Sequence, residues 1–123
     1  MGFSMTSVAA DSAMTVAGAT TVDTAKAKEL FDNEVLFMDV RKNSDWDAGR
    51  VPGAVHIELK KKFSAEAMLE EMKKDEGVVI YCNGASCLRS SEASEKAVNW
   101  GFTNVYYYRD GFPAWKTAGH PVE

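Results

Sequence analysis

The sequence predicts an α/β fold in which helices flank a mainly parallel sheet of five strands. Apolar runs typical of strands alternate with capped helical segments along most of the chain, and this alternation favours a parallel sheet with helices on both faces. With 123 residues, of which 46% are hydrophobic and 26% charged, the chain has the size and composition of one globular domain.

Short apolar runs and capping residues delimit the elements in order. Residues 35–38 are apolar without alternation, which is typical of a strand buried on both faces. Asp23 or Thr24 is expected to cap the first helix, and Ser64 a later one. The predicted strands span residues 20–22, 35–38, 55–57, 78–81 and 105–108. The predicted helices span residues 24–31, 44–48, 65–74 and 88–100, and the apolar stripe of the third comprises Ala65, Met68, Leu69 and Met72.

Charge and cysteine content exclude several classes of partner. The net charge of −4 offers no basic surplus to neutralise phosphates, so nucleic acid is not expected as a partner. No apolar run reaches membrane-spanning length, and no membrane partner is expected. Two cysteines are too few for a disulfide framework or a closed zinc site, so no metal is expected.

Residues 1–19 are expected to form a flexible N-terminal leader before a domain that spans residues 20–123. The segment is rich in Ala, Ser, Thr and Met, and it lacks the basic start and unbroken apolar stretch of an intact signal peptide. The compartment stays open between cytoplasm and periplasm, and a monomer or weak dimer is expected.

Cys82 is the main candidate for chemistry. It follows the strand predicted at residues 78–81 and precedes a polar loop and a helix. This layout places a side chain at the carboxyl edge of a parallel sheet, beside a helix N-terminus. Unpaired backbone N–H groups and the helix dipole there favour a thiolate, which is the nucleophilic form of cysteine.

The loop after Cys82 has the composition of an anion cradle. Gly84 permits backbone angles that point successive N–H groups to one centre, while Ser86 and Arg89 add a hydroxyl donor and a cation. Each such donor can contribute about 2.7–4 kcal/mol to a developing anion. The site suits sulfur transfer through a persulfide, or phosphoryl or arsenate chemistry. The plainer interpretation is an inert buried cysteine at the end of a strand.

Three separated segments resemble the single-domain rhodaneses, a family of sulfurtransferases. The first comprises residues 38–41 and 46–57, which are similar to the family's D-V-R and G-H-I-P-G-A signatures, with Arg50 where His is usual. The second comprises residues 79–82 with Arg89 and Ser90, and the third residues 110–122. Three motifs in the family's order are a specific signal, and the resemblance implies the three-layer rhodanese-like fold.

The resemblance also implies a mechanism. A sulfane-sulfur donor such as thiosulfate converts Cys82 to a persulfide, and a small-molecule or protein thiol, or cyanide, accepts the sulfur without metal or organic cofactor. The implied substrate-binding loop comprises Asn83, Gly84, Ala85, Ser86, Cys87, Leu88 and Arg89. Asp39 and Arg41, after the second strand, are expected to shape the pocket through an ion pair or a loop cap.

Loop length departs from the family pattern. Six residues separate Cys82 from Arg89, where rhodaneses usually have four and the related cell-cycle phosphatases and arsenate reductases five. A wider cradle favours, as alternatives, arsenate reductase or phosphatase-like activity. Cys87 within this loop is either a resolving thiol for Cys82, as in a sulfur carrier or redox module, or a small packed hydrophobe.

Overall fold

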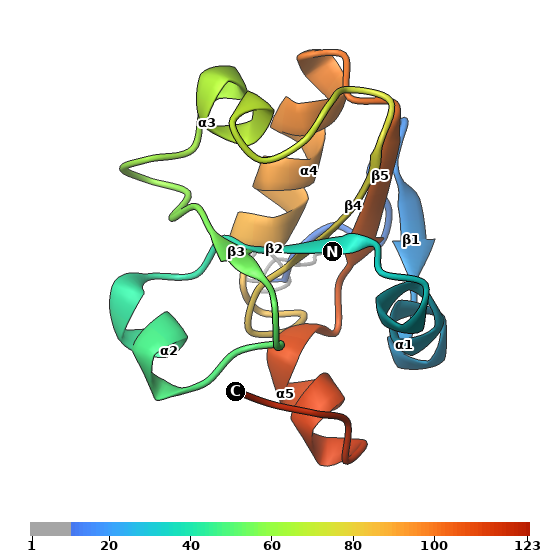
Figure 1. Cartoon of the computed structure of the whole chain (residues 1–123), viewed down its shortest axis with the longest axis vertical. Coiled ribbons are helices and arrows are strands. Elements are labelled where there is room, and N and C mark those ends of the chain that lie inside the picture. The colour runs from blue at the N-terminus through green and yellow to red at the C-terminus, as the bar shows by residue number, and fades with distance from the viewer. Residues whose placement is uncertain (1–10) are drawn as a thin grey trace, which may run out of the picture.

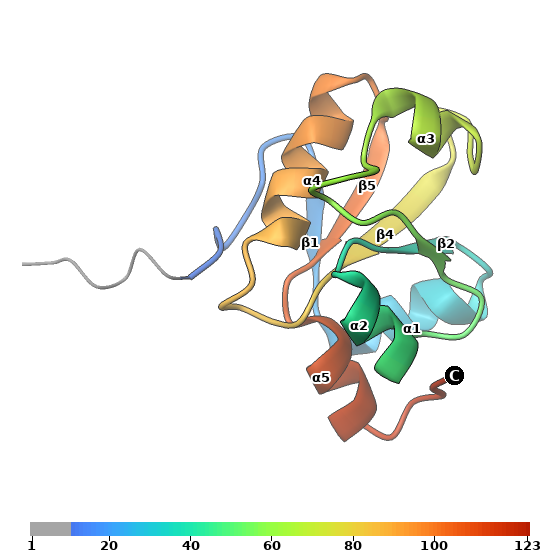
Figure 2. The ribbon, with the colours of Figure 1, turned by 90° about the vertical axis from the view of Figure 1, so that its left-hand side faces the viewer.

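The computed structural model describes residues 11–123, which form a parallel five-stranded sheet with helices on both faces (Figures 1 and 2). The strand order is β1-β5-β4-β2-β3 and every neighbouring pair is parallel, which confirms the predicted fold class. The strands are β1 (Thr20–Val22), β2 (Leu36–Asp39), β3 (Val55–His56), β4 (Gly77–Tyr81) and β5 (Asn104–Tyr108). The helices are α1 (Thr24–Asp32), α2 (Asn43–Ala48), α3 (Ala65–Leu69), α4 (Arg89–Asn99) and α5 (Gly111–Thr117).

Alternate residues of the central strands face two separate apolar cores. Val78 and Ile80 of β4 pack in one core with Ala93 and Ala97 of α4. Their neighbours Val79 and Tyr81 pack in the other core with residues of α1 and α5, including Leu30 and Trp115. Because side chains alternate along a strand, the residue that follows Tyr81 points to the α4 side.

Helix caps follow the sequence closely at two positions. The Asp23 carboxylate accepts a hydrogen bond from the backbone N–H of Lys26 at 2.8 Å, and the Ser64 hydroxyl accepts one from Ala67 at 3.0 Å. Both side chains satisfy N–H groups that a helix start leaves unpaired. These two predicted caps are confirmed.

Helix α3 is shorter than predicted. It ends at Leu69, whose side chain is 48% exposed, so the prediction that Leu69 belongs to the buried stripe is wrong. After Leu69 the N–H groups of Glu71 and Met72 both bond to the carbonyl of Met68, three and four residues back, so the helix ends in a turn. Met68 and Met72 are buried, as expected.

The first ten residues of the predicted leader lie outside the described residues. Within residues 11–123, no helix is long and apolar enough to cross a membrane. The predicted boundary after residue 19 stays a prediction, although the chain just before it has definite contacts. The Tyr107 hydroxyl donates to the carbonyl of Ala13 at 2.6 Å, and Val16 is 8% exposed.

Candidate functional site

Strand β4 delivers Cys82 to the carboxyl edge of the sheet. The side chain joins the apolar core on the α4 side and is 1% exposed. The loop that starts at Cys82 leads into α4, which begins at Arg89. The strand, loop and helix layout expected from the sequence is therefore present.

Cys82 and Cys87 are joined by a disulfide, and no free cysteine occurs among residues 11–123. Cys87 is partly exposed and packs against the core that contains Cys82. Cys87 thus shows a feature of each alternative. It is bonded to Cys82, and it also packs against the core as a small hydrophobe would. Whether Cys87 resolves a Cys82 intermediate stays a prediction.

The turn between β5 and α5 packs against the start of the loop that follows Cys82. The N–H of Phe112 donates to the carbonyl of Cys82 at 2.9 Å. Gly111 has φ +71°, and a Cβ there would clash with the Cys82 carbonyl oxygen and lie 2.8 Å from the nitrogen of Gly84. Only glycine fits this close backbone contact, so the family-like motif at residues 110–122 positions the cysteine loop.

Several amides of the loop have no partner. Among residues 11–123, the N–H groups of residues 83–86 and 88 make no hydrogen bond, whereas Cys87 donates to the carbonyl of Gly84 at 3.0 Å. These donors lie in the segment between the end of β4 and the N-terminus of α4. Free N–H groups at such a position suit an anion.

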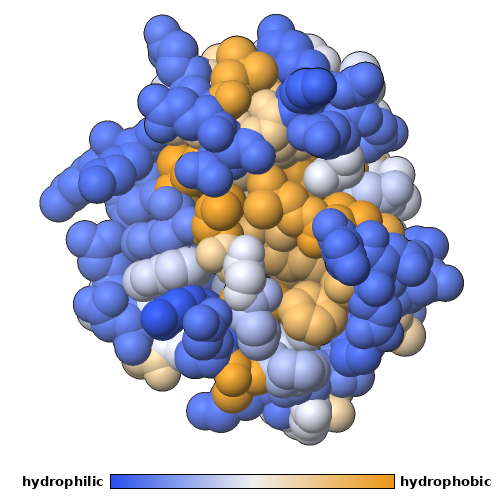
Figure 3. Space-filling view, in the orientation of Figure 1, coloured by the Kyte–Doolittle hydropathy of each residue, from blue (hydrophilic) through white to orange (hydrophobic). Residues whose placement is uncertain are grey.

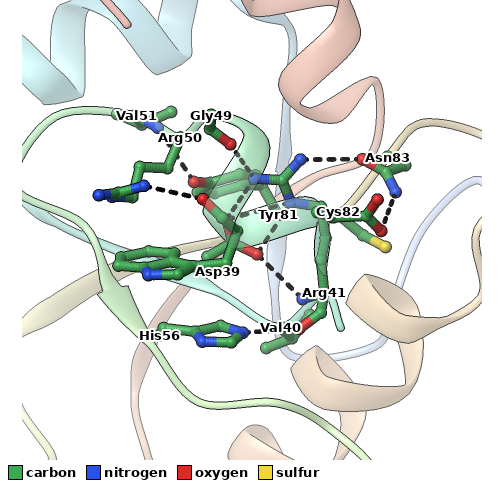
Figure 4. A network of polar contacts seen from close by, with 12 residues as sticks. Asp39, Val40, Arg41, Gly49, Arg50, Val51, His56, Tyr81, Cys82 and Asn83 are labelled. Carbon is green, nitrogen blue, oxygen red and sulfur yellow. Dashed lines mark hydrogen bonds and ion pairs between the residues drawn. The ribbon is translucent and has the colours of Figure 1, made fainter. Parts of the chain in front are cut away.

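Asp39 and Arg41 form a buried ion pair beside the loop (Figure 4). Arg41 donates from Nε and Nη2 to the Asp39 carboxylate, at distances of 2.7–3.1 Å. Its Nη1 donates to the side-chain oxygen of Asn83 at 3.1 Å, and Asn83 in turn donates to Asp45 at 2.8 Å. The ion pair thereby reaches the first residue after Cys82, and a pocket-shaping role for the pair stays a prediction.

Aromatic and backbone groups complete the surroundings of Arg41. Its guanidinium lies 4.6 Å from the ring centroid of Phe112, and Nη2 donates to the carbonyl of Gly49 at 2.6 Å. Burial lowers the pKa of Arg41, but the hydrogen bond and charge of Asp39 outweigh burial and raise it above its ordinary value. For Tyr81, in contrast, burial raises the pKa of the hydroxyl. This hydroxyl accepts a hydrogen bond from the N–H of Val51. Both groups therefore keep their protons at neutral pH.

Arg89 is paired with a carboxylate, Glu58, for which the sequence predicts no role. Its guanidinium pairs with Glu58, and Nη1 also donates to the carbonyl of Val40 at 3.3 Å. The hydrogen bond from Arg89, with further bonds from the backbone of Lys60 and Lys61, lowers the pKa of Glu58. A lone acid between the apolar residues Ile57 and Leu59 was the available sequence signal. Donor binding by Arg89 stays a prediction.

A basic groove lies next to this pair. Its volume is about 380 Å³, and its lining includes Arg89 and four exposed lysines, Lys42, Lys60, Lys61 and Lys62. Figure 3 shows hydrophilic surface on the side where α2 and the β3–α3 connection lie. The run Lys60–Lys62 is exposed, as a solvated loop would be, and it also lines a groove that the sequence did not reveal.

The chain before β1 also touches the loop. The backbone N–H and the hydroxyl of Ser12 both donate to the carbonyl of Ala85, at 2.7 and 2.8 Å. Arg109 donates to the carbonyls of Ser12 and Ala13, which ties this segment to the end of β5. Loop residues 83–89 are thus held by contacts from several parts of the chain.

One family model and several curated proteins match this chain. The family model "Rhodanese-like domain" matches residues 23–118. The thiosulfate sulfurtransferase GlpE of Pseudoalteromonas translucida is 31% identical over 99 residues, which cover 79% of this chain and 89% of GlpE. The HTH-type transcriptional regulator Rv0324 of Mycobacterium tuberculosis is 34% identical over 90 residues, but the match spans only 38% of that regulator's length and 73% of this chain.

A solved structure is similar over most of its length. A Rhodopseudomonas palustris protein, RPA3614, described as a possible tyrosine phosphatase, has a TM-score of 0.70 and 28% identity, with 85% of each chain covered.

Proposed function

The chain belongs to the rhodanese-like domain family, and from this premise we propose that it transfers sulfane sulfur through a persulfide on Cys82. The donor is thiosulfate or another persulfide, and the acceptor is cyanide, a small thiol or a protein thiol. The observation that supports the proposal most strongly is the position of Cys82 at the start of a loop whose amides at residues 83–86 and 88 have no partner within residues 11–123.

The reaction begins from the reduced site. A dithiol first reduces the Cys82–Cys87 disulfide, which frees the Cys82 thiolate. The thiolate attacks the outer sulfur of thiosulfate, and the bond between the two thiosulfate sulfurs breaks. Sulfite leaves with that electron pair, and Cys82 carries a persulfide anion. Cyanide then attacks the outer sulfur, so that thiocyanate leaves and the Cys82 thiolate returns.

Loop amides are assigned to charge stabilisation. The N–H groups of Asn83, Gly84, Ala85, Ser86 and Leu88 face the developing sulfur anion in this proposal, together with the positive end of α4. Asp39 and Arg41 position the loop through Asn83 and need no contact with the substrate. The exposed lysines of the groove attract the dianionic donor.

Arsenate reductase or phosphatase-like activity is the second candidate. The lengthened loop and the likeness to a possible tyrosine phosphatase support it. The pairing of Arg89 with Glu58 does not separate the two candidates, because thiosulfate, phosphate and arsenate are all tetrahedral oxyanions that would meet the same compensated cation.

A panel assay on the reduced protein tests the proposal. Sulfur transfer from thiosulfate to cyanide, lost in Cys82→Ser, supports it. Turnover of p-nitrophenyl phosphate or arsenate without thiocyanate formation supports the second candidate and contradicts the first.

A further inference from the structure

The disulfide between Cys82 and Cys87 indicates how the persulfide sulfur could leave the protein. It shows that the loop can bring the Cys87 sulfur within bonding distance of the Cys82 sulfur. The hydrogen bond from the Cys87 N–H to the carbonyl of Gly84 folds the loop back at this point, and Gly84 has φ +116° there. A thiol held in this way attacks far faster than the same thiol free in solution.

We propose that the Cys87 thiol displaces the sulfane sulfur from the Cys82 persulfide and that the product is sulfide. This inference rests on the proposed function, which supplies the persulfide. The Cys87 thiolate attacks Sγ of Cys82, the inner sulfur of the persulfide. The outer sulfur takes up a proton from water, the bond between the inner and outer sulfurs breaks, and hydrosulfide leaves with the electron pair. The disulfide in the structure is the resulting state of the protein.

The unequal exposure of the two cysteines in the disulfide state indicates how the site is reset. Cys82 is 1% exposed, whereas Cys87 is partly exposed and precedes Leu88, which is 49% exposed. An external dithiol therefore attacks the sulfur of Cys87, and Cys82 leaves as the thiolate. The free amides of the loop stabilise that leaving group. The dithiol then closes its own disulfide by displacing Cys87.

The atoms and electrons of one cycle balance. Thiosulfate and a dithiol are converted to sulfite, hydrogen sulfide and a disulfide. The dithiol is oxidised by two electrons, and the sulfane sulfur of thiosulfate is reduced by two. The partner inferred is thus a dithiol reductant, which acts after each sulfur transfer rather than as the direct sulfur acceptor.

A single-turnover experiment without reductant tests whether Cys87 displaces the persulfide sulfur. The full chain is reduced with dithiothreitol, freed of it anaerobically, and mixed with one equivalent of thiosulfate. Sulfide is then quantified, and the protein mass is measured after alkylation. The wild type is expected to release one equivalent of sulfide and form the Cys82–Cys87 disulfide in equal amount. Cys87→Ser is expected to retain the added sulfur on Cys82 and to release at least about tenfold less sulfide.

The outcomes separate the two proposals. If the wild type keeps the added sulfur and forms neither sulfide nor disulfide, Cys87 does not displace the sulfur. Sulfur transfer to Cys82 would still be supported by that result. If neither protein takes up sulfur, the proposed function itself fails and the inference fails with it. Cys87→Ala and far-UV circular dichroism check folding. The equal yields of sulfide and disulfide in the wild type provide a readout that needs no variant.

Discussion

The guanidinium of Arg41 lies on the carboxylate of Asp39, with Nη2 2.7 Å from Oδ2, and the side chains are only 4% and 0% exposed. Two residues separated by one position thus form a charge pair inside the protein, next to the cysteine loop. Breaking such a pair leaves an uncompensated buried charge, which costs much more than the loss of an exposed pair.

Asp39→Asn is therefore expected to lower the free energy of unfolding by about 3–5 kcal/mol. Urea denaturation measures this loss. Glu29→Gln is the matched control, because it removes the exposed ion pair with Lys26, and its effect on the free energy of unfolding should be far smaller. Equal effects of the two substitutions would show that the buried pair has no special weight.

The close contact of Gly111 with the loop gives a second prediction. Gly111→Ala places a Cβ against the Cys82 carbonyl oxygen, while Gly119→Ala meets no atom within 4 Å although its φ is similar, +81° against +71°. Both variants have a backbone strain of about 1–2 kcal/mol, and only Gly111→Ala has the clash in addition. Gly111→Ala should cost about 1–3 kcal/mol more in urea denaturation and should also reduce sulfur transfer. Similar losses for both would contradict the contact.

Acid sensitivity follows from the pair of Glu58 and Arg89. Arg89 lowers the pKa of Glu58 in the folded protein, so the pair stabilises the fold above the ordinary pKa of glutamate. That stability is lost as the pH falls through the lowered pKa. Glu58→Gln should therefore destabilise the protein at about pH 7 and much less at about pH 3. A loss that is the same at both pH values, measured by urea denaturation, would exclude this linkage.

Lysines of the basic groove give a prediction on substrate capture. Replacing Lys60, Lys61 and Lys62 by Gln should lower kcat/KM for thiosulfate by about tenfold at low salt and flatten its salt dependence. The control changes the same number of exposed lysines away from the groove, at Lys73, Lys74 and Lys116. An equal decrease in the control would assign the effect to net charge alone.

Much of the fold was predictable because its signals are local. Continuous apolar runs marked buried strands such as β2, and Asp23 and Ser64 marked helix starts. The end of α3 was not predictable, because the apolar spacing continues to Met72 while the helix ends at Leu69 and the chain turns toward β4.

The site was predictable only in part, because several of its contacts join segments that are distant in the sequence. The strand, loop and helix pattern located Cys82, but the bond to Cys87 depends on how the loop folds at Gly84. Contacts between distant segments left no local pattern. Ser12 and Ala85 are 73 positions apart, and Glu58 and Arg89 are 31 apart.

The most direct test compares Cys82→Ser with Cys87→Ser in sulfur transfer from thiosulfate to cyanide, after both proteins are reduced. Cyanide takes the outer sulfur directly, so the reaction needs the nucleophile but not the second thiol. We predict that Cys87→Ser retains turnover, while Cys82→Ser loses it by at least about a thousandfold. Retention of full activity by Cys82→Ser would contradict the assignment of Cys82 as the sulfur-carrying residue.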